Sequence, residues 1–492
     1  MAFENSQTFA FESKKKVDTY QFASTCRVEV QEGKQIKKVV CTKAMPKMMY
    51  SEKSEGAISF SGKTAYQVMY QTEEGELASV FSEIEWQDKI DYLGNDTYFL
   101  CPRIVENTIT GFSSSEVQIS SLIEVNIYAI DSNKVASVVN LTPDYVTKQR
   151  NVEYQKLVNS INQTFTEVHE EDINQKVDQV LLYDAEVVLK NATAGIDSIT
   201  LEGQIYISTY ILNEGIVQLL NKTIDFKQEM AMLSVVPNNI LETEIALNML
   251  KVTANVNQTD KQTNLVYSME LAVNVVAFSK DYADIIEDAF STQKEIAISS
   301  QCVENSVLQE QNSYSVNVNG SVDLNREDID MLCIVNSVQA SVTENAPTLI
   351  KGVVELNAVA LTENNEYVKI EGIIPFSVEK TDSYEELNVS ARVVSYKLRG
   401  KEIEVTLELN IKYKKQTIEY IPYLSSIEEK EQKQQNQSAI RVYITSDSED
   451  LYKVAKAMNV RPETIASQNN IEGEHISQNS RLVVYSPLDI EF

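Results

Sequence analysis

Apolar and polar side chains alternate along much of the chain, most clearly between positions 403 and 413. The apolar residues at every second position of this run are Ile403, Val405, Leu407, Leu409 and Ile411. A period of two places one side of a strand on a core and the other in water, whereas a helix would scatter these residues around its axis. Similar runs occupy 205–208, 314–318 and 354–358. The pattern predicts a mainly β chain of antiparallel sheets.

One longer pattern occurs three times. A glycine at 62, 203 or 352 opens a strand, an acidic turn follows, and a second strand returns to an Ile-x-aromatic motif. The motifs are Ile84/Trp86, Ile224/Phe226 and Ile374/Phe376, and the aromatic residue lies 24, 23 and 24 residues after the glycine. An Ile and an aromatic residue two positions apart share one strand face, so we expect both in a core. Because the copies are domain-sized, we predict three separate domains instead of a solenoid.

The predicted organisation follows from these repeats and from composition. Polar stretches with few apolar residues cannot bury enough surface to fold alone, so we assign them to connections. The segments are a flexible amino-terminal arm (1–21), β domain 1 (22–143), a joiner with weak helical periodicity (144–175), β domain 2 (176–292), β domain 3 (293–424), a polar linker (425–438) and a carboxy-terminal module (439–492). Each β domain is expected to be an antiparallel sandwich or barrel-like sheet.

In the carboxy-terminal module the period changes from two to helical and back to two. Leu451, Val454, Ala455 and Met458 fall on one helical stripe, and Pro462 suits the first turn of a second helix. The predicted order is therefore β-α-α-β within about fifty residues. In order and length this module resembles a LysM domain, through Val454-Ala455, the pair Asn469-Asn470 and the closing Leu-Val-Val strand.

The three repeated domains resemble SPOCS domains, through the glycine strands, the acidic turns and the Ile-x-aromatic motifs. SPOCS repeats followed by a LysM module resemble the SipL-like spore-coat morphogenetic family of sporulating Firmicutes. That resemblance implies a mother-cell location at the forespore surface, spore-coat or envelope proteins as partners, and binding of the coat basement-layer ATPase through the LysM module. The domain sequences have diverged, so a related coat, exosporium or self-assembling fibre component remains an alternative.

The LysM resemblance also implies where partners bind. The candidate positions in its loops are Ser448, Glu449, Asp450, Leu451, Asn469, Asn470 and His475. A glycan-binding LysM has glycine where Ser448 stands, and it lacks the acidic pair Glu449-Asp450. Carboxylates suit a basic protein surface better than a neutral glycan, which favours protein binding. Binding of peptidoglycan is the alternative.

Composition narrows the classes of partner. Lys plus Arg number 43 against 72 Asp plus Glu, a formal net charge of −29. Such a surface repels nucleic-acid phosphates and anionic lipids, so we expect neither nucleic-acid binding nor membrane insertion. The amino terminus has no secretory h-region and no stretch reaches the roughly 18 apolar residues of a membrane helix, which predicts a cytoplasmic protein. The five scattered cysteines fit reduced thiols.

No catalytic motif stands out. The histidines are His169 and His475, neither in an HExxH or paired-ligand spacing. The stretch 56–64 superficially resembles a P-loop, but its glycines are one residue too far apart and it reads as a strand. We therefore predict no enzyme activity, no metal and no cofactor.

Overall fold

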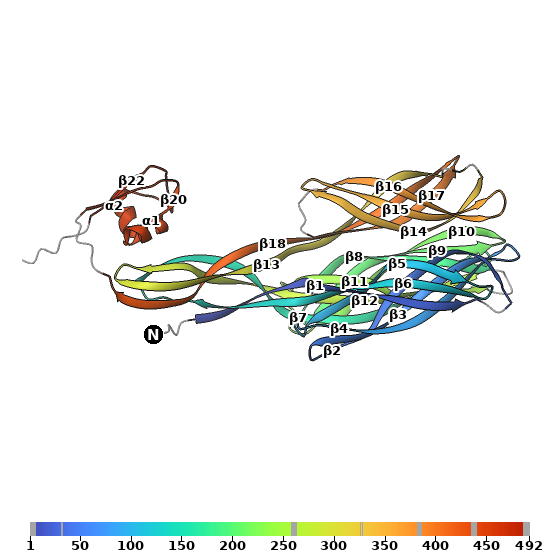
Figure 1. Ribbon diagram of the computed structural model, residues 1–492, viewed down its shortest axis with the longest axis horizontal. Helices are drawn as coiled ribbons and strands as arrows, with labels where there is room; N and C mark the ends of the chain where they lie inside the picture. Colours follow the sequence, from blue (N-terminus) through green and yellow to red (C-terminus); the bar gives the residue numbers. More distant parts are fainter. Residues whose placement is uncertain are drawn as a thin grey trace, which may run out of the picture.

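The computed structural model describes residues 6–30, 33–256, 263–324, 326, 328–380, 386–433 and 440–485. Within these residues, eighteen long strands form three repeats of six, and a small helical module follows (Figure 1). This confirms the mainly β prediction with a β-α-α-β carboxy-terminal unit. The alternation at 403–411 behaves as expected, because Ile403, Leu407 and Ile411 are all fully buried.

The strands of the three repeats have the following bounds. Repeat 1 contains β1 (Ser6–Glu29), β2 (Ile36–Ser54), β3 (Ala57–Thr72), β4 (Leu77–Asp91), β5 (Tyr98–Phe112) and β6 (Glu116–Val138). Repeat 2 contains β7 (Tyr145–Ile173), β8 (Gln179–Ala194), β9 (Ser198–Asn213), β10 (Ile216–Ala231), β11 (Ile240–Val256) and β12 (Thr263–Ser291). Repeat 3 contains β13 (Lys294–Asp323), β14 (Ile329–Ala346), β15 (Leu349–Thr362), β16 (Tyr367–Glu379), β17 (Glu386–Arg399) and β18 (Glu402–Gln432).

All three repeats share one topology. Their sheets are ordered β1-β6-β5 and β2-β3-β4 in repeat 1, β7-β12-β11 and β8-β9-β10 in repeat 2, and β13-β18-β17 and β14-β15-β16 in repeat 3. Every pairing within them is antiparallel. The two sheets of a repeat share a core between them, as expected of a sandwich.

The recurring glycine and aromatic residue lie directly opposite each other on paired strands. Gly62 pairs with Trp86, Gly203 with Phe226, and Gly352 with Phe376. All three rings are buried, and a Cβ added to any of these glycines would collide with the ring. The 23- to 24-residue spacing is therefore the length of a hairpin that brings each ring over its glycine.

The second strand of each repeat is interrupted by a β-bulge at the same place. The pairing skips Val40, Leu181 and Cys333, opposite the positions seven and eight residues after the repeat's glycine. Val40 and Leu181 are buried. Bulges at an edge strand redirect its side chains and block open-ended strand pairing. Here they turn Val40 and Leu181 toward the neighbouring repeats, in one shared cluster.

The predicted arm and joiner are strands. The described part of the arm belongs to β1, which pairs with β6. Most of the joiner is β7, which pairs with β12. Those predictions were wrong because partners 90 or more residues away stabilise these segments. The linker prediction was wrong for 425–432, the end of β18, which pairs with β13. Residues 1–5 of the arm and 434–438 of the linker lie outside the described residues.

The outer halves of the longest strand pairs form a stalk, which we define as residues 6–13 with 131–138, 145–156 with 279–291, and 294–308 with 416–432. The three two-stranded ribbons pack on one another through Phe9, Tyr154 and Ile421 among others. Gln155 joins all three ribbons, because its amide donates to Glu12 O (2.9 Å) and accepts from Leu308 N (2.9 Å). In Figure 1 the stalk runs from the sandwiches to the carboxy-terminal module.

The repeats pack around a common axis, so they are not the three separate domains that the sequence predicted. The fourth strand of each repeat contacts the second strand of the next, so β4 meets β8, β10 meets β14, and β16 meets β2. This cyclic pattern is a pseudo-threefold arrangement.

Charged residues are also buried where the repeats meet: Lys14 of β1 lies 3.2 Å from Glu244 of β11, and Lys414 of β18 lies 2.7 Å from Glu242. A different packing of the repeats would separate such a pair and leave an uncompensated buried charge. That packing would therefore be strongly disfavoured.

Candidate functional site in the carboxy-terminal module

The module follows the predicted order with one short strand pair added. Its elements are β19 (Ile440–Ile444), β20 (Glu449–Asp450), α1 (Leu451–Met458), α2 (Pro462–Asn469), β21 (His475–Ile476) and β22 (Arg481–Tyr485). Val454, Ala455 and Ile465 from the helices pack against Leu482 and Val484 of β22. Both helices have 8 residues, and no helix in the described part of the chain is long and apolar enough to cross a membrane.

The pairing of β20 with β21 brings the two predicted binding loops together. Glu449 lies opposite Ile476, and Asp450 lies opposite His475. Ser448 and His475 are exposed, whereas Glu449 is half-buried and accepts a hydrogen bond from Tyr443 OH (3.3 Å). We call residues 446–450 with 471–477 the loop face. Of the candidate residues, Ser448 and His475 have the position and exposure that contact with a partner requires, whereas the Oε2 atom of Glu449 is buried.

Three other candidates have structural roles. The Asn469 side chain donates to Ile465 O (2.9 Å) and Val483 O (2.9 Å) and accepts from Val483 N (2.7 Å), which ties α2 to β22. Asn470 ends α2 in the left-handed conformation, with φ 54°. Leu451 is half-buried against the module core.

Asp450 also serves the fold. Its carboxylate caps α1 by accepting from Tyr452 N (2.8 Å) and forms an ion pair with Lys148 of β7 (2.7 Å). Burial opposes ionisation of this carboxyl, but the hydrogen bonds from Lys148 and Tyr452 N outweigh it and hold its pKa below the usual range. Asp450 is therefore occupied by the stalk and is not available to a partner.

Sequence reasoning missed three acids of the loop face. Asp447, Glu472 and Glu474 are exposed on the same loops as Glu449. Together they give this face a clear negative charge. The Ile-Glu-Gly-Glu-His run at 471–475 is a signal that could have found two of them, because a charged run beside a glycine is typical of an exposed turn.

The module is docked on the end of the stalk through α1. Tyr452 packs edge-on against Phe290 of β12, with ring centroids 5.4 Å apart. Lys456 forms an ion pair with Asp288 (2.7 Å), and Asn459 donates to Thr292 O (3.2 Å). Burial raises the pKa of the Tyr452 hydroxyl, and the nearby Asp288 adds to this effect. Apart from Asp450, the loop face and the outer sheet surface are left uncovered by these contacts.

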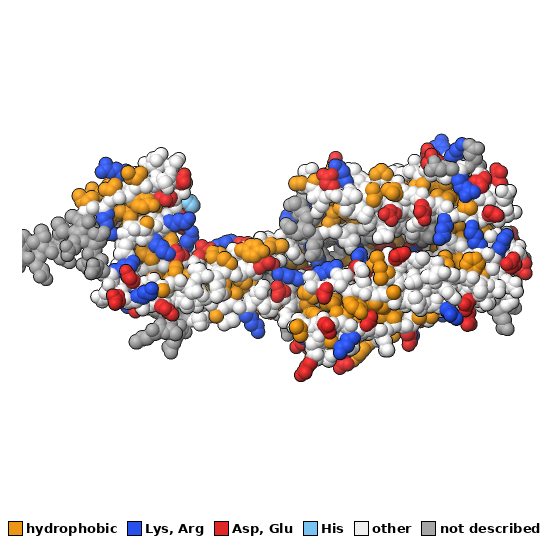
Figure 2. Space-filling model, in the orientation of Figure 1, with side chains coloured by type: hydrophobic (Ala, Val, Ile, Leu, Met, Phe, Trp, Pro, Cys, Tyr) orange, Lys and Arg blue, Asp and Glu red, His pale blue; other side chains and the backbone are white. Residues whose placement is uncertain are grey.

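The outer surface of the β19-β22 sheet is apolar and exposed. Ile440, Val442, Ile444 and Tyr485 are 57, 48, 65 and 56 % exposed, whereas Tyr443 between them packs against the module core. The alternation in β19 is thus reversed relative to the usual expectation that the apolar set faces the core. Figure 2 shows hydrophobic side chains gathered on this part of the module. Exposed apolar patches of this kind are typical of protein-binding surfaces.

Comparisons of the chain with protein-family models, with curated proteins and with solved structures found no match. Among the described residues, no cluster of three or more His, Cys, Asp or Glu side chains could hold a metal ion.

Proposed function

We propose that this protein is a non-catalytic scaffold of spore-coat or envelope assembly that recruits another coat protein through its LysM-like module. The proposal rests on one observation: the module is held on the stalk in a single orientation that leaves two of its surfaces open. Contacts of α1 fix it to the end of the stalk, and the acidic loop face and the apolar sheet surface remain open. A module held in one orientation loses less conformational freedom on binding than a tethered one.

The acidic loop face favours a basic surface on the partner. Asp447, Glu449, Glu472 and Glu474 lie together within a chain that is itself strongly acidic. Complementary charge raises the rate of encounter and selects among partners. The mother-cell location and the basement-layer ATPase as partner rest on the resemblance of the sequence to SPOCS–LysM proteins, and both belong to this proposal.

The proposal is tested by measuring binding of the full chain to purified coat basement-layer ATPase. We expect the double substitution Glu472→Lys/Glu474→Lys to weaken binding by about tenfold or more, since both acids are exposed on the loop face and the change reverses their charge. The matched control is Glu463→Lys, an exposed acid at the start of α2, which should bind like the unmodified chain. Equal binding by both variants would contradict the loop-face assignment, and retention of the chain on purified peptidoglycan without any ATPase binding would favour the glycan alternative.

A further inference from the structure

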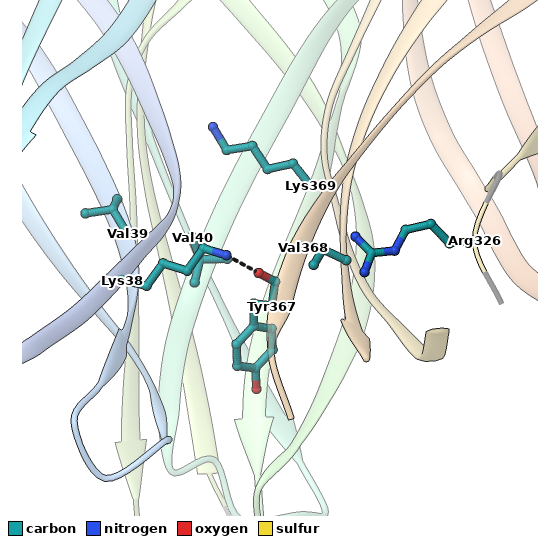
Figure 3. Close-up of a pocket in the computed structure, with 7 residues that line it drawn as sticks. All are labelled: Lys38, Val39, Val40, Arg326, Tyr367, Val368 and Lys369. Carbon is teal, nitrogen blue, oxygen red and sulfur yellow. Dashed lines mark hydrogen bonds between the residues drawn. The ribbon is translucent and has the colours of Figure 1, made fainter. Parts of the chain in front are cut away.

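Two of the contacts between repeats are bridged by a side chain that bonds to the backbone of the neighbouring repeat. The Gln67 amide donates to Tyr183 O (3.0 Å) and accepts from Tyr183 N (3.0 Å), which joins repeats 1 and 2. Lys38 Nζ donates to Tyr367 O (2.7 Å), which joins repeats 1 and 3 (Figure 3). Hydrogen bonds of this kind orient the neighbouring strands and contribute modestly to stability.

A second contact between repeats 1 and 2 is made by three side chains instead. Lys47 Nζ of β2 donates to Glu270 Oε2 of β12 (2.7 Å). Asn248 Nδ2 of β11 donates to the other oxygen of the same carboxylate, Glu270 Oε1 (2.6 Å). One carboxylate therefore holds an amine of repeat 1 and a carboxamide of repeat 2 next to each other.

These three side chains are largely withdrawn from water. Asn248 is 8 % exposed, and the side chains of Lys47 and Glu270 are each 18 % exposed. An ion pair in such a place contributes little net stability, because the loss of hydration offsets the attraction. Exclusion of water also removes the commonest competitor of a reaction between the groups. The site is therefore better suited to chemistry than to stabilisation by charge.

The fold does not require these polar groups at this place. Asn248 is the residue that a β-bulge leaves unpaired in β11, and the equivalent bulges of β5 and β17 leave Val105 and Val394 unpaired. The residues equivalent to Glu270 in β6 and β18 are Leu122 and Thr406. Since two repeats form the same bulge without an amide or a carboxylate, the polar groups of repeat 2 have a purpose other than forming the bulge.

The three groups have the roles of a nucleophile, an electrophile and a shared base. Burial opposes ionisation of Glu270, but the hydrogen bonds from Lys47 and Asn248 outweigh it and hold the pKa of its carboxyl below the usual range. The ionised carboxylate can take a proton from the Lys47 ammonium, which leaves a nucleophilic amine. The carboxamide of Asn248 is held beside this amine by the same carboxylate, so the reacting groups are already oriented.

We propose that Lys47 Nζ and Asn248 Cγ become joined by an amide bond, which links repeat 1 covalently to repeat 2. The amine nitrogen attacks Cγ, and the bond from Cγ to Nδ2 breaks. Glu270 passes two protons in turn from the attacking nitrogen to the leaving nitrogen, so ammonium is released and the carboxylate is restored. The step needs no oxidant and no second reactant. It goes beyond the proposed scaffold role and does not depend on the partner of the module.

The test is the intact mass of the denatured full chain. We expect a mass about 17 Da below that of the sequence, the mass of one ammonia. Tryptic digestion should release residues 44–53 joined to 228–251, because trypsin does not cleave after an acylated lysine. Lys47→Arg keeps the positive charge beside Glu270 but supplies no amine, so this variant should have its full sequence mass. Asn248→Val, which copies the residue of the equivalent bulges, should also have its full sequence mass.

The matched control is Lys63→Arg. Lys63 lies opposite Lys47 on the paired strand and forms its own ion pair with Glu85 (3.1 Å). This variant should still show the loss of about 17 Da. The emission of Trp86, the single tryptophan, verifies that repeat 1 is folded in each variant.

Three outcomes would overturn the proposal. The first is an unmodified chain with its full sequence mass, and the second is a Lys47→Arg variant that still loses ammonia. The third is a loss of about 18 Da, the mass of water, because it would mean that Lys47 is joined to Glu270 instead of Asn248. Binding of the ATPase by the module does not enter this measurement, so its outcome is independent of the scaffold proposal.

Discussion

The ring of Trp86 lies across Gly62 on the paired strand, and its indole Nε1 donates to Thr64 Oγ1 (3.0 Å). Phe226 and Phe376 cover the equivalent glycines of the other repeats. A glycine inside a strand is unfavourable by itself, because it has no side chain to pack. Here the aromatic ring occupies the missing volume, so the pair must be kept as a unit. The recurring motif is a packing device rather than a binding site.

Replacing Gly62 tests, at the residue scale, whether the glycine and the ring of Trp86 must be kept together. We expect Gly62→Ala to destabilise repeat 1 by about 1 to 3 kcal/mol, since the added Cβ forces the ring out of its place. Displaced from its buried position, Trp86 should emit at longer wavelength, and urea unfolding followed by this emission measures the loss. The control is Gly111→Ala in β5 of the same repeat, where the nearest atom would be 3.7 Å from the Cβ. Equal stability of the two variants would contradict the account.

At the scale of elements, α1 links the module to the stalk, because one side of the helix packs in the module core and the other contacts the stalk. One side of the helix fills the module core with Val454 and Ala455, and Tyr452 packs on Phe290. The ion pairs Lys148–Asp450 and Lys456–Asp288 flank this aromatic contact. Since partly exposed pairs contribute little, the buried rings supply most of the docking energy.

Truncation of the stalk aromatic tests this docking. We expect Phe290→Ala to remove a buried contact at a cost of roughly 3 to 5 kcal/mol and to free the module from the stalk. Small-angle X-ray scattering should then show a larger radius of gyration, with Trp86 emission unchanged. Tyr282→Ala, an exposed aromatic residue of the same strand, serves as the control. A scattering profile unaltered by Phe290→Ala would mean that other contacts hold the module.

At the scale of the whole molecule, one side chain bridges two repeats. Burial raises the pKa of Tyr210 well above its usual range, so its hydroxyl stays protonated and can both donate and accept. Its partner is the backbone of Val335 in β14. The neighbouring cluster joins Val40, Leu181 and Ile334 from the three repeats. The pseudo-threefold core is therefore held by apolar packing and oriented by a few side chain to backbone bonds.

Removal of that hydroxyl tests the contact between repeats 2 and 3. Tyr210→Phe leaves a buried N–H and C=O of Val335 without this partner, which we expect to cost about 1 to 3 kcal/mol. Hydrogen exchange measured by mass spectrometry should show faster exchange in β14. Tyr206→Phe is the control, because its hydroxyl donates to Gln204 on its own strand (2.6 Å). Unchanged protection of β14 in the Tyr210 variant would refute this role.

The sequence alone determined the alternating strands within the sandwiches, the recurring hairpins and the β-α-α-β module, because these follow from the period of apolar residues and from turns between near neighbours. It did not determine the strands at 6–21, 145–173 and 425–432, where that period is weak. The positions Ser448 and His475, which the LysM resemblance implies, lie exposed on the loop face. Only the tertiary structure decided that β1 pairs with β6, that Lys14 is buried, that β19 turns its apolar side outward, and that Lys47 meets Glu270 between repeats 1 and 2. These features depend on contacts between residues far apart in the chain, and local periodicity does not encode which strand face or which repeat a residue will meet.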